Sequence, residues 1–241
     1  MQFAAVLLAV VLALPTVLAA GSGGEMVRVG LAYGSGALVN ANLENNTGYG
    51  SGYRMGYFDD DLDFVELAWT DEDETQITMV KTQNTWVNGT SYSNSDNGGD
   101  VIGCYHVLVE SGYRSYEQAA ADAQEYRDGF VAWIDGDYQV RAGSYTSRQE
   151  AEDAAQSLGG TVAGTSSYAV NVTRTGTAEI LFQFDGGDAL ALGVMPDVTG
   201  ADAVRTWFKG YRYCGGFRYE RIGGGDLTVV NIVDLETYIK G

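Results

Sequence analysis

The sequence predicts an α+β fold built around a βαββαβ unit at residues 104–172, with a four-stranded antiparallel sheet and two helices on one face. Three observations predict it. A strand–turn–helix pattern occurs twice, with the helix signals 32 residues apart. Each copy opens its helix with a capping signal, and an Asp-Gly hairpin connects the copies. Internal repetition of this kind indicates architecture before any single residue does.

The helix signals of the two copies match position by position. The first copy reads YHVLVESGYRSYEQAAADAQEY from Tyr105, and the second reads YQVRAGSYTSRQEAEDAAQSL from Tyr138. Ser115 with Gln118, and Ser147 with Glu150, have the spacing of a capping box, which satisfies the free amides that open a helix. The apolar residues that follow recur at i, i+4 and i+7; they are Ala119, Ala123 and Tyr126, and Ala151, Ala155 and Leu158.

The strands of the unit carry their own signals. One extra residue in the first copy, at Glu110 and Ser111, predicts a β-bulge in its strand. GFVAWIDG from Gly129 predicts a strand ending in a turn at Asp135 and Gly136, and therefore a hairpin with the second copy's strand. The segment from Tyr168 to Val172 is expected to supply the fourth strand.

With these elements in place, residues 104–172 resemble a SPOR domain, the sporulation-related repeat that binds peptidoglycan glycan strands stripped of their peptide stems. The second copy, YQVRAGSYTSRQEAEDAA, is the closer match to the strand-Gly-Ser-aromatic-helix pattern of that family, whereas the first copy has ESGY at that place. The resemblance implies a peptidoglycan-binding domain over residues 100–172. It also implies a binding role for Ser144 and Tyr145 of the motif.

The flanking segments resemble a second family. VRVGLAYGSGALVNANLENNTGYGSGYRMGYFD from Val27, and YRYCGGFRYERIGGGDLTVVNIVDLETYIKG from Tyr211, look like parts of the N-terminal module of SpoIID/LytB proteins. These are stage II sporulation protein D and the amidase enhancer. The resemblance implies mainly β segments at 25–99 and 173–241, the second incomplete. In that family the catalytic glutamate of a lytic transglycosylase lies in the segment after a Leu-Glu-x-Tyr-x-x-Gly motif, which reads LETYIKG from Leu235 here. We therefore assign no catalytic residue. Glu236, which lies inside the motif, is expected to be structural.

Strand alternation then predicts which side chains would face a glycan. Val140 and Ala142 suit the side under the helices, which turns Gln139 and Arg141 to the open face. On the middle strand, the side chains expected to face the helices are those of Phe130, Ala132 and Ile134. Val131 and Trp133 would then lie on the open face of the sheet. An exposed Trp beside polar arms can stack on a pyranose; the alternative is that a neighbouring module covers Trp133. The predicted glycan-binding residues are His106, Leu108, Trp133, Gln139, Arg141, Ser144 and Tyr145.

Charge and cysteine content exclude several classes of function. A net charge of −18 argues against nucleic acid as a partner and favours a neutral or weakly charged polymer. Cys104 and Cys214 have neither metal-ligand nor redox spacing, so we expect no metal and no cofactor. They would form a disulfide that joins the inserted unit to the C-terminal module, or remain two buried free thiols.

The N-terminal segment, 1–20, is expected to be a signal peptide or membrane anchor, because an apolar run ends in small residues. This segment predicts an exported, extracytoplasmic protein, and the two family resemblances imply a cell-wall protein that binds stem-free glycan strands during sporulation or division. One alternative is the N-terminal portion of a lytic transglycosylase or amidase enhancer whose catalytic half is missing from this chain. In another, the acidic N-terminal module recruits a cell-wall amidase as partner.

Overall fold

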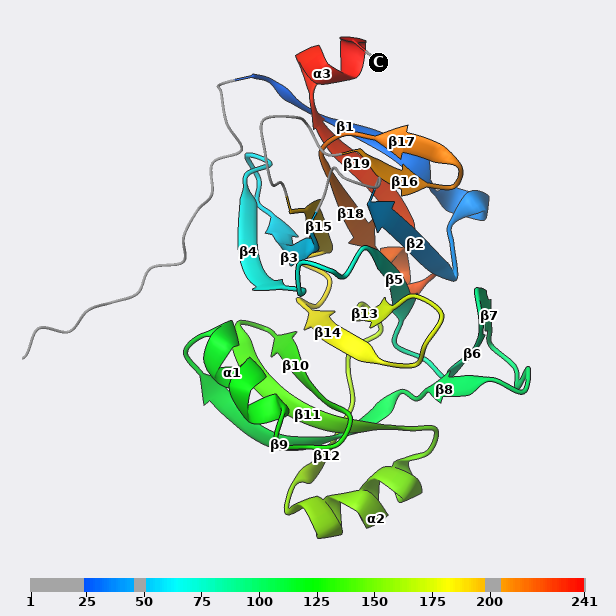
Figure 1. Cartoon of the computed structure of the whole chain (residues 1–241), viewed down its shortest axis with the longest axis vertical. Helices are drawn as coiled ribbons and strands as arrows, with labels where there is room; N and C mark the ends of the chain where they lie inside the picture. The colour runs from blue at the N-terminus through cyan, green and yellow to red at the C-terminus, as the bar shows by residue number, and fades with distance from the viewer. Residues whose placement is uncertain (1–23, 46–50, 198–204, 241) are drawn as a thin grey trace, which may run out of the picture.

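The computed structural model describes residues 24–45, 51–197 and 205–240, and over these residues the chain is mostly β (Figure 1). The predicted signal peptide or anchor at 1–20 lies outside the described residues. One large sheet has six strands, in the order β1 (Met26–Ala32), β19 (Thr228–Asp234), β18 (Gly216–Glu220), β15 (Leu192–Pro196), β3 (Tyr53–Phe58) and β4 (Phe64–Trp69).

A second sheet has ten strands, and a small sheet has three. The order in the ten-stranded sheet is β12 (Thr161–Ala163), β9 (Tyr105–Tyr113), β11 (Asp137–Tyr145), β10 (Gly129–Ile134), β14 (Ile180–Asp185), β13 (Val170–Arg174), β5 (Gln76–Lys81), β2 (Asn40–Asn45), β16 (Thr206–Phe208) and β17 (Tyr211–Tyr213). The small sheet is β7 (Ser91–Ser93), β6 (Thr85–Asn88) and β8 (Asp100–Ile102).

Helices are few and short in the described ranges. They are α1 (Tyr116–Ala123), α2 (Arg148–Leu158), α3 (Leu235–Lys240) and the 3-10 turns η1 (Gly34–Gly36) and η2 (Ile222–Gly224). Helix α1 packs against β10 and β11, and α2 packs against β9 and β12. None of these described helices has the length and apolar character needed to cross a membrane.

The main core joins the two large sheets. Tyr53, Val194 and Phe217 from the six-stranded sheet belong to the same buried cluster as Phe182 and Phe184 from the ten-stranded sheet. The opposite face of the ten-stranded sheet packs against the small sheet in a second cluster, which contains Val80, Val87, Ile102, Phe130, Ala132 and Ile180. The middle of the ten-stranded sheet is therefore buried on both faces.

The predicted α+β fold, with a separate four-stranded antiparallel βαββαβ domain, is wrong. The strands of residues 104–172 are part of the ten-stranded sheet, in which β10 pairs in parallel with β14. Strand β13, which overlaps the predicted fourth strand, lies between β14 and β5, and β12 takes the outer edge beside β9. The physical reason is that β10 is apolar on both faces and would be an unpaired edge in a four-stranded sheet. Pairing with β14 removes that edge.

Most local predictions within this segment are confirmed, but the capping box expected at Ser115 is only half formed. Ser147 forms the reciprocal capping box with Glu150, and the Ser115 hydroxyl accepts from the amide of Gln118. The hairpin of β10 and β11 turns through Asp135 and Gly136, both at positive φ (48° and 94°). Ala119, Ala123, Ala151 and Ala155 are all buried on their helices. The sequence predicts a single bulge at Glu110 and Ser111. Strand β9 instead has a register shift on each side of this pair.

Candidate functional site

The predicted glycan-binding face exists as a set of neighbouring side chains, but it is covered. Arg141 lies opposite Phe130, and Gln139 lies opposite Ala132, whose side chain packs in the cluster under the small sheet. Both His106 and Arg141 are buried, at 0% and 3% exposure. A glycan chain has no access to side chains at this depth.

Instead of facing solvent, these polar groups bond to one another. His106 Nδ1 donates to the carbonyl oxygen of Gly143 (2.8 Å), and its Nε2 accepts from the side-chain amide of Gln183 (3.1 Å). That amide also donates to Asn171 Oδ1 (2.7 Å), while the Gln183 oxygen accepts from Arg141 (2.7 Å). Arg141 also donates to the side-chain oxygen of Gln139 (2.8 and 3.1 Å) and to the carbonyl of Gly164 (3.0 Å).

Burial sets the charge state of this network. It lowers the pKa of His106 to about 4, and the nearby Arg141 charge acts in the same direction. The histidine is therefore neutral at pH 7, which agrees with its role as acceptor at Nε2. Desolvation also lowers the pKa of Arg141, to about 10, so the guanidinium stays charged and needs its polar partners. The arrangement is that of an internal structural network.

The prediction that Val131 and Trp133 face outward is wrong. Trp133 is only 8% exposed and stacks on Phe184, with ring centroids 5.1 Å apart, in the core between the large sheets. Strand alternation could not decide this, because β10 is apolar on both faces and both faces are covered. The set expected under the helices, Phe130, Ala132 and Ile134, packs in or against the cluster under the small sheet.

The remaining predicted residues lie at intermediate exposure. Leu108 and Gln139 are half-buried, and the Ser144 hydroxyl accepts from the amide of Gly103 (2.7 Å). Tyr145 packs over Gly143, whose backbone has a positive φ of 73°. Burial raises the pKa of the Tyr145 phenol. Ser144 thus links β11 to the segment between β8 and β9, and Tyr145 packs against its own strand.

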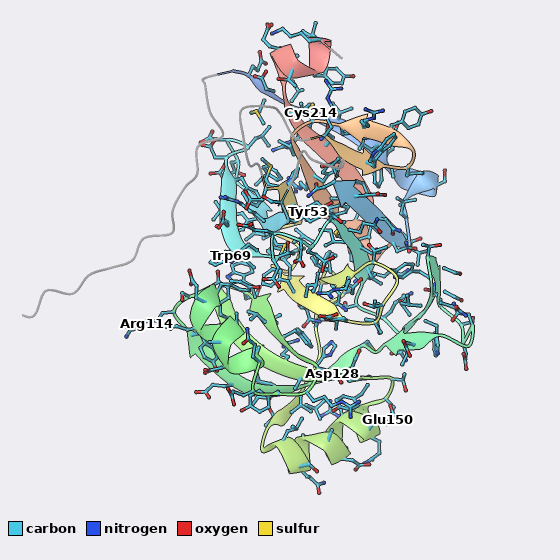
Figure 2. The ribbon with its side chains drawn as sticks, in the orientation of Figure 1. Tyr53, Trp69, Arg114, Asp128, Glu150 and Cys214 are labelled. Atoms are coloured by element: carbon cyan, nitrogen blue, oxygen red, sulfur yellow. The ribbon has the colours of Figure 1, made fainter. Side chains whose placement is uncertain are left out.

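The two cysteines are free thiols of intermediate exposure, so the disulfide alternative is not formed. Cys104 lies between β8 and β9, whereas Cys214 lies between β17 and β18, near the end of the molecule that carries α3 (Figure 2). Neither is fully buried, which differs from the thiol alternative considered above.

Glu236 does not sit in an enclosed site. It lies in the first turn of α3 with its side chain 73% exposed, and it pairs with Lys240 at 3.8 Å. A general acid for glycan cleavage needs a desolvated carboxyl group inside a walled cleft. The expectation that Glu236 is structural stays a prediction.

A pocket of about 500 Å³ lies beside the β16–β17 hairpin, α3 and the adjoining strands β1 and β19. We term it the aromatic-arginine pocket and define it by Arg205, Trp207, Tyr211, Arg212, Tyr213 and Tyr238. Tyr211 and Tyr238 are exposed at 70% and 54%, unusually high values for large rings that line a concave surface.

The hairpin positions most of this pocket. Its two-residue turn, Lys209-Gly210, has positive φ at both positions (50° and 82°), as tight hairpin turns require. This turn places Arg212 opposite Trp207, and the guanidinium carbon stacks 4.7 Å from the indole centroid. Tyr213 is held by edge-on contacts with Phe208 and Phe217, at 6.2 and 6.1 Å. Trp207 and Tyr213 are therefore held in place by neighbouring side chains.

Charge distinguishes this pocket from the rest of the molecule. The chain carries 32 acidic and 14 basic residues, yet the described residues that line this pocket include Arg205 and Arg212 and no Asp or Glu. Guanidinium groups recognise carboxylates in a bidentate way, and aromatic faces stack on the C–H face of a pyranose. The pocket is suited to a ring-bearing ligand with a carboxylate.

Sequence reasoning did not single out these residues. The available signal was the run TWFKGYRYC, from Thr206, which places four aromatic rings and an arginine around a Lys-Gly turn. Tyr238 lies more than twenty residues further on and comes beside the hairpin only through the tertiary fold.

Comparison with known proteins adds no relative: no protein-family model, curated protein or solved structure matches this chain. Among the described residues, no group of three or more His, Cys, Asp or Glu side chains could hold a metal ion. The aromatic-arginine pocket is the candidate functional site.

Proposed function

We propose that this chain is an exported cell-wall protein that binds peptidoglycan glycan strands lacking peptide stems, through the aromatic-arginine pocket. Removal of a stem leaves a free carboxylate on each muramyl sugar, so the ligand combines pyranose rings with regularly spaced negative charges. The observation that carries the proposal is the meeting of Trp207, Tyr211 and Tyr238 with two guanidinium groups in one pocket.

The proposal keeps the ligand class implied by the sequence resemblance and moves the binding residues. His106, Trp133 and Arg141 are committed to internal contacts, whereas Tyr211 and Arg212 are exposed. The protein has a net charge of −18 and would repel a carboxylated polymer over most of its surface. The two arginines give this pocket a local positive charge that attracts the carboxylates. The described lining of this pocket supports binding of a glycan strand, because it contains no carboxyl group that could cleave one.

The test compares retention of the full chain on sacculi treated with an amidase and on untreated sacculi. We expect much stronger retention on the treated material. Tyr211→Ala should weaken binding by about 1–3 kcal/mol, as loss of an aromatic anchor does at other interfaces. Arg212→Ala should weaken it and reduce its dependence on salt, because a carboxylate contact is lost.

Two control variants make the result specific. Arg148→Ala removes the same charge from the exposed face of α2, where Arg148 pairs with Glu152 at 2.9 Å, and should leave retention unchanged. Gln139→Ala probes the face predicted from sequence. Loss of binding in Gln139→Ala but not in Tyr211→Ala would place the site on that face, and equal retention on both kinds of sacculi would refute the ligand.

A further inference from the structure

A second concave surface lies on another part of the molecule, where α1 meets the turn between β4 and β5 and the start of β14. It has a volume of about 460 Å³, and we term it the Trp69 groove. Its lining includes Trp69, Asp71, Glu74, Tyr116, Glu117 and Glu179, together with Arg174. Figure 2 shows Trp69 at the end of β4 that approaches α1.

The aromatic wall of this groove is fixed but not covered. Trp69 and Tyr116 meet edge to face, with centroids 4.8 Å apart, and the Tyr116 hydroxyl donates to the carbonyl oxygen of Trp69 (2.9 Å). Tyr116 also touches Phe182 of the core edge to face, at 6.3 Å. Trp69 nevertheless remains 39% exposed. A preorganised, half-exposed indole in a groove is suited to contact a ligand.

The rest of the lining is rich in carboxylates. The described lining residues carry four carboxylates and one guanidinium, which are those of Asp71, Glu74, Glu117, Glu179 and Arg174. Arg174 Nε lies 2.9 Å from Glu74 and 3.4 Å from Glu179, so one cation serves two anions. Burial raises the pKa of Glu74; the Arg174 charge opposes this rise, and the neighbouring carboxylates of Glu179 and Asp73 add to it. The groove is short of positive charge.

We propose that the Trp69 groove binds a primary ammonium group carried on a short aliphatic chain, as in a lysine side chain. The methylenes would lie on the Trp69 and Tyr116 rings, and the ammonium would bond to the carboxylates that Arg174 leaves under-compensated. This ligand is opposite in charge to the ligand proposed for the aromatic-arginine pocket. The two proposals are therefore independent, and an experiment can refute one without affecting the other.

The experiment titrates the full chain at low ionic strength with n-pentylamine and with Nα-acetyl-lysine methylamide. Their neutral counterparts are 1-pentanol and Nα-acetyl-norleucine methylamide. The readout is the indole N–H signal of Trp69 in heteronuclear NMR spectra, assigned by its loss in Trp69→Phe. We expect both amines to shift this signal and the neutral compounds to leave it in place. A shift with the lysine compound alone would identify a peptide as the source of the amine.

Variants locate the binding. Asp71→Asn combined with Glu179→Gln removes two exposed carboxylates and should weaken amine binding about tenfold. Glu117→Gln, an exposed position in the first turn of α1, gives a second test if that pair perturbs the fold. Glu152→Gln on α2 is the matched control and should have no effect. Equal shifts with neutral compounds, an unmoved Trp69 signal, or full binding by the carboxylate variants would overturn the proposal.

Discussion

At the scale of single residues, the chain's one histidine shows how burial changes the role of a polar side chain. His106 has the residue type of a surface binding group, yet the fold covers it and gives it two hydrogen-bond partners. Its neutral form is required, because Nε2 must accept from Gln183 while Nδ1 donates to Gly143. The consequence is a dependence of stability on pH.

We expect acid to destabilise the protein partly through His106. The ordinary pKa of 6.5 falls to about 4 in the folded state, so the unfolded chain binds the proton more readily between these values. Stability is fully present above pH 6.5 and is lost as the pH falls toward 4. The loss from this group is about 3 kcal/mol at pH 4. Denaturant unfolding across this range measures it.

His106→Gln is the informative comparison for that effect. Carboxylates also titrate in acid, so the quantity of interest is the difference in slope between the variant and the parent chain. The variant is expected to have a shallower loss of stability between pH 6.5 and pH 4. Parallel curves would mean that His106 is not buried in its neutral form.

At the scale of elements, the two helices of the repeat differ in how completely their first turns are capped. At α2, Ser147 accepts from the amide of Glu150, and the Glu150 carboxylate accepts from the amide of Ser147 (3.0 Å) and from Thr146. These bonds lower the pKa of the Glu150 carboxyl. At α1, the Ser115 hydroxyl accepts from the amide of Gln118 (3.4 Å, against 3.3 Å for the equivalent bond at α2), but the Gln118 side chain makes no return bond to the cap.

Ser147→Ala should therefore destabilise the protein by about 1 kcal/mol, because an N-terminal amide of α2 loses its acceptor. Ser157→Ala, at an exposed position later in the same helix, should change stability by less than about 0.5 kcal/mol. Chemical denaturation of both variants compares the two. An equal effect of the two substitutions would show that the cap at Ser147 contributes nothing specific.

At the scale of the whole molecule, the strands of residues 104–172 depend on the rest of the chain. Strand β10 bonds to β14, and Trp133 packs on Phe184 of that strand and near Tyr57 of the six-stranded sheet. Separation of residues 100–175 would remove β14, the six-stranded sheet and two strands of the small sheet, so that α1 would be left as the main cover of the apolar strand β10. We therefore expect the long sheet to unfold together with its two covering sheets.

Residues 100–175 expressed alone should consequently show no cooperative thermal or denaturant transition, whereas residues 24–240 should unfold in one. Circular dichroism and tryptophan fluorescence follow both chains. The expected reason is the loss of the β14 partner and of the Phe182 and Phe184 side chains from the core. A sharp transition in the short chain would show that it folds as an independent domain.

What the sequence by itself determined about this protein is local. The caps at Ser115 and Ser147, the turn at Asp135 and Gly136 and the buried alanines follow from spacings of a few residues, because their hydrogen bonds and contacts lie within that distance. The tertiary structure alone decided which faces are exposed. Phe184 of β14 and the six-stranded sheet bury Trp133, whereas His106 and Arg141 are buried in the network with Gln183 of β14. The aromatic-arginine pocket likewise needs segments far apart in the chain, whose approach depends on packing rather than on any local pattern.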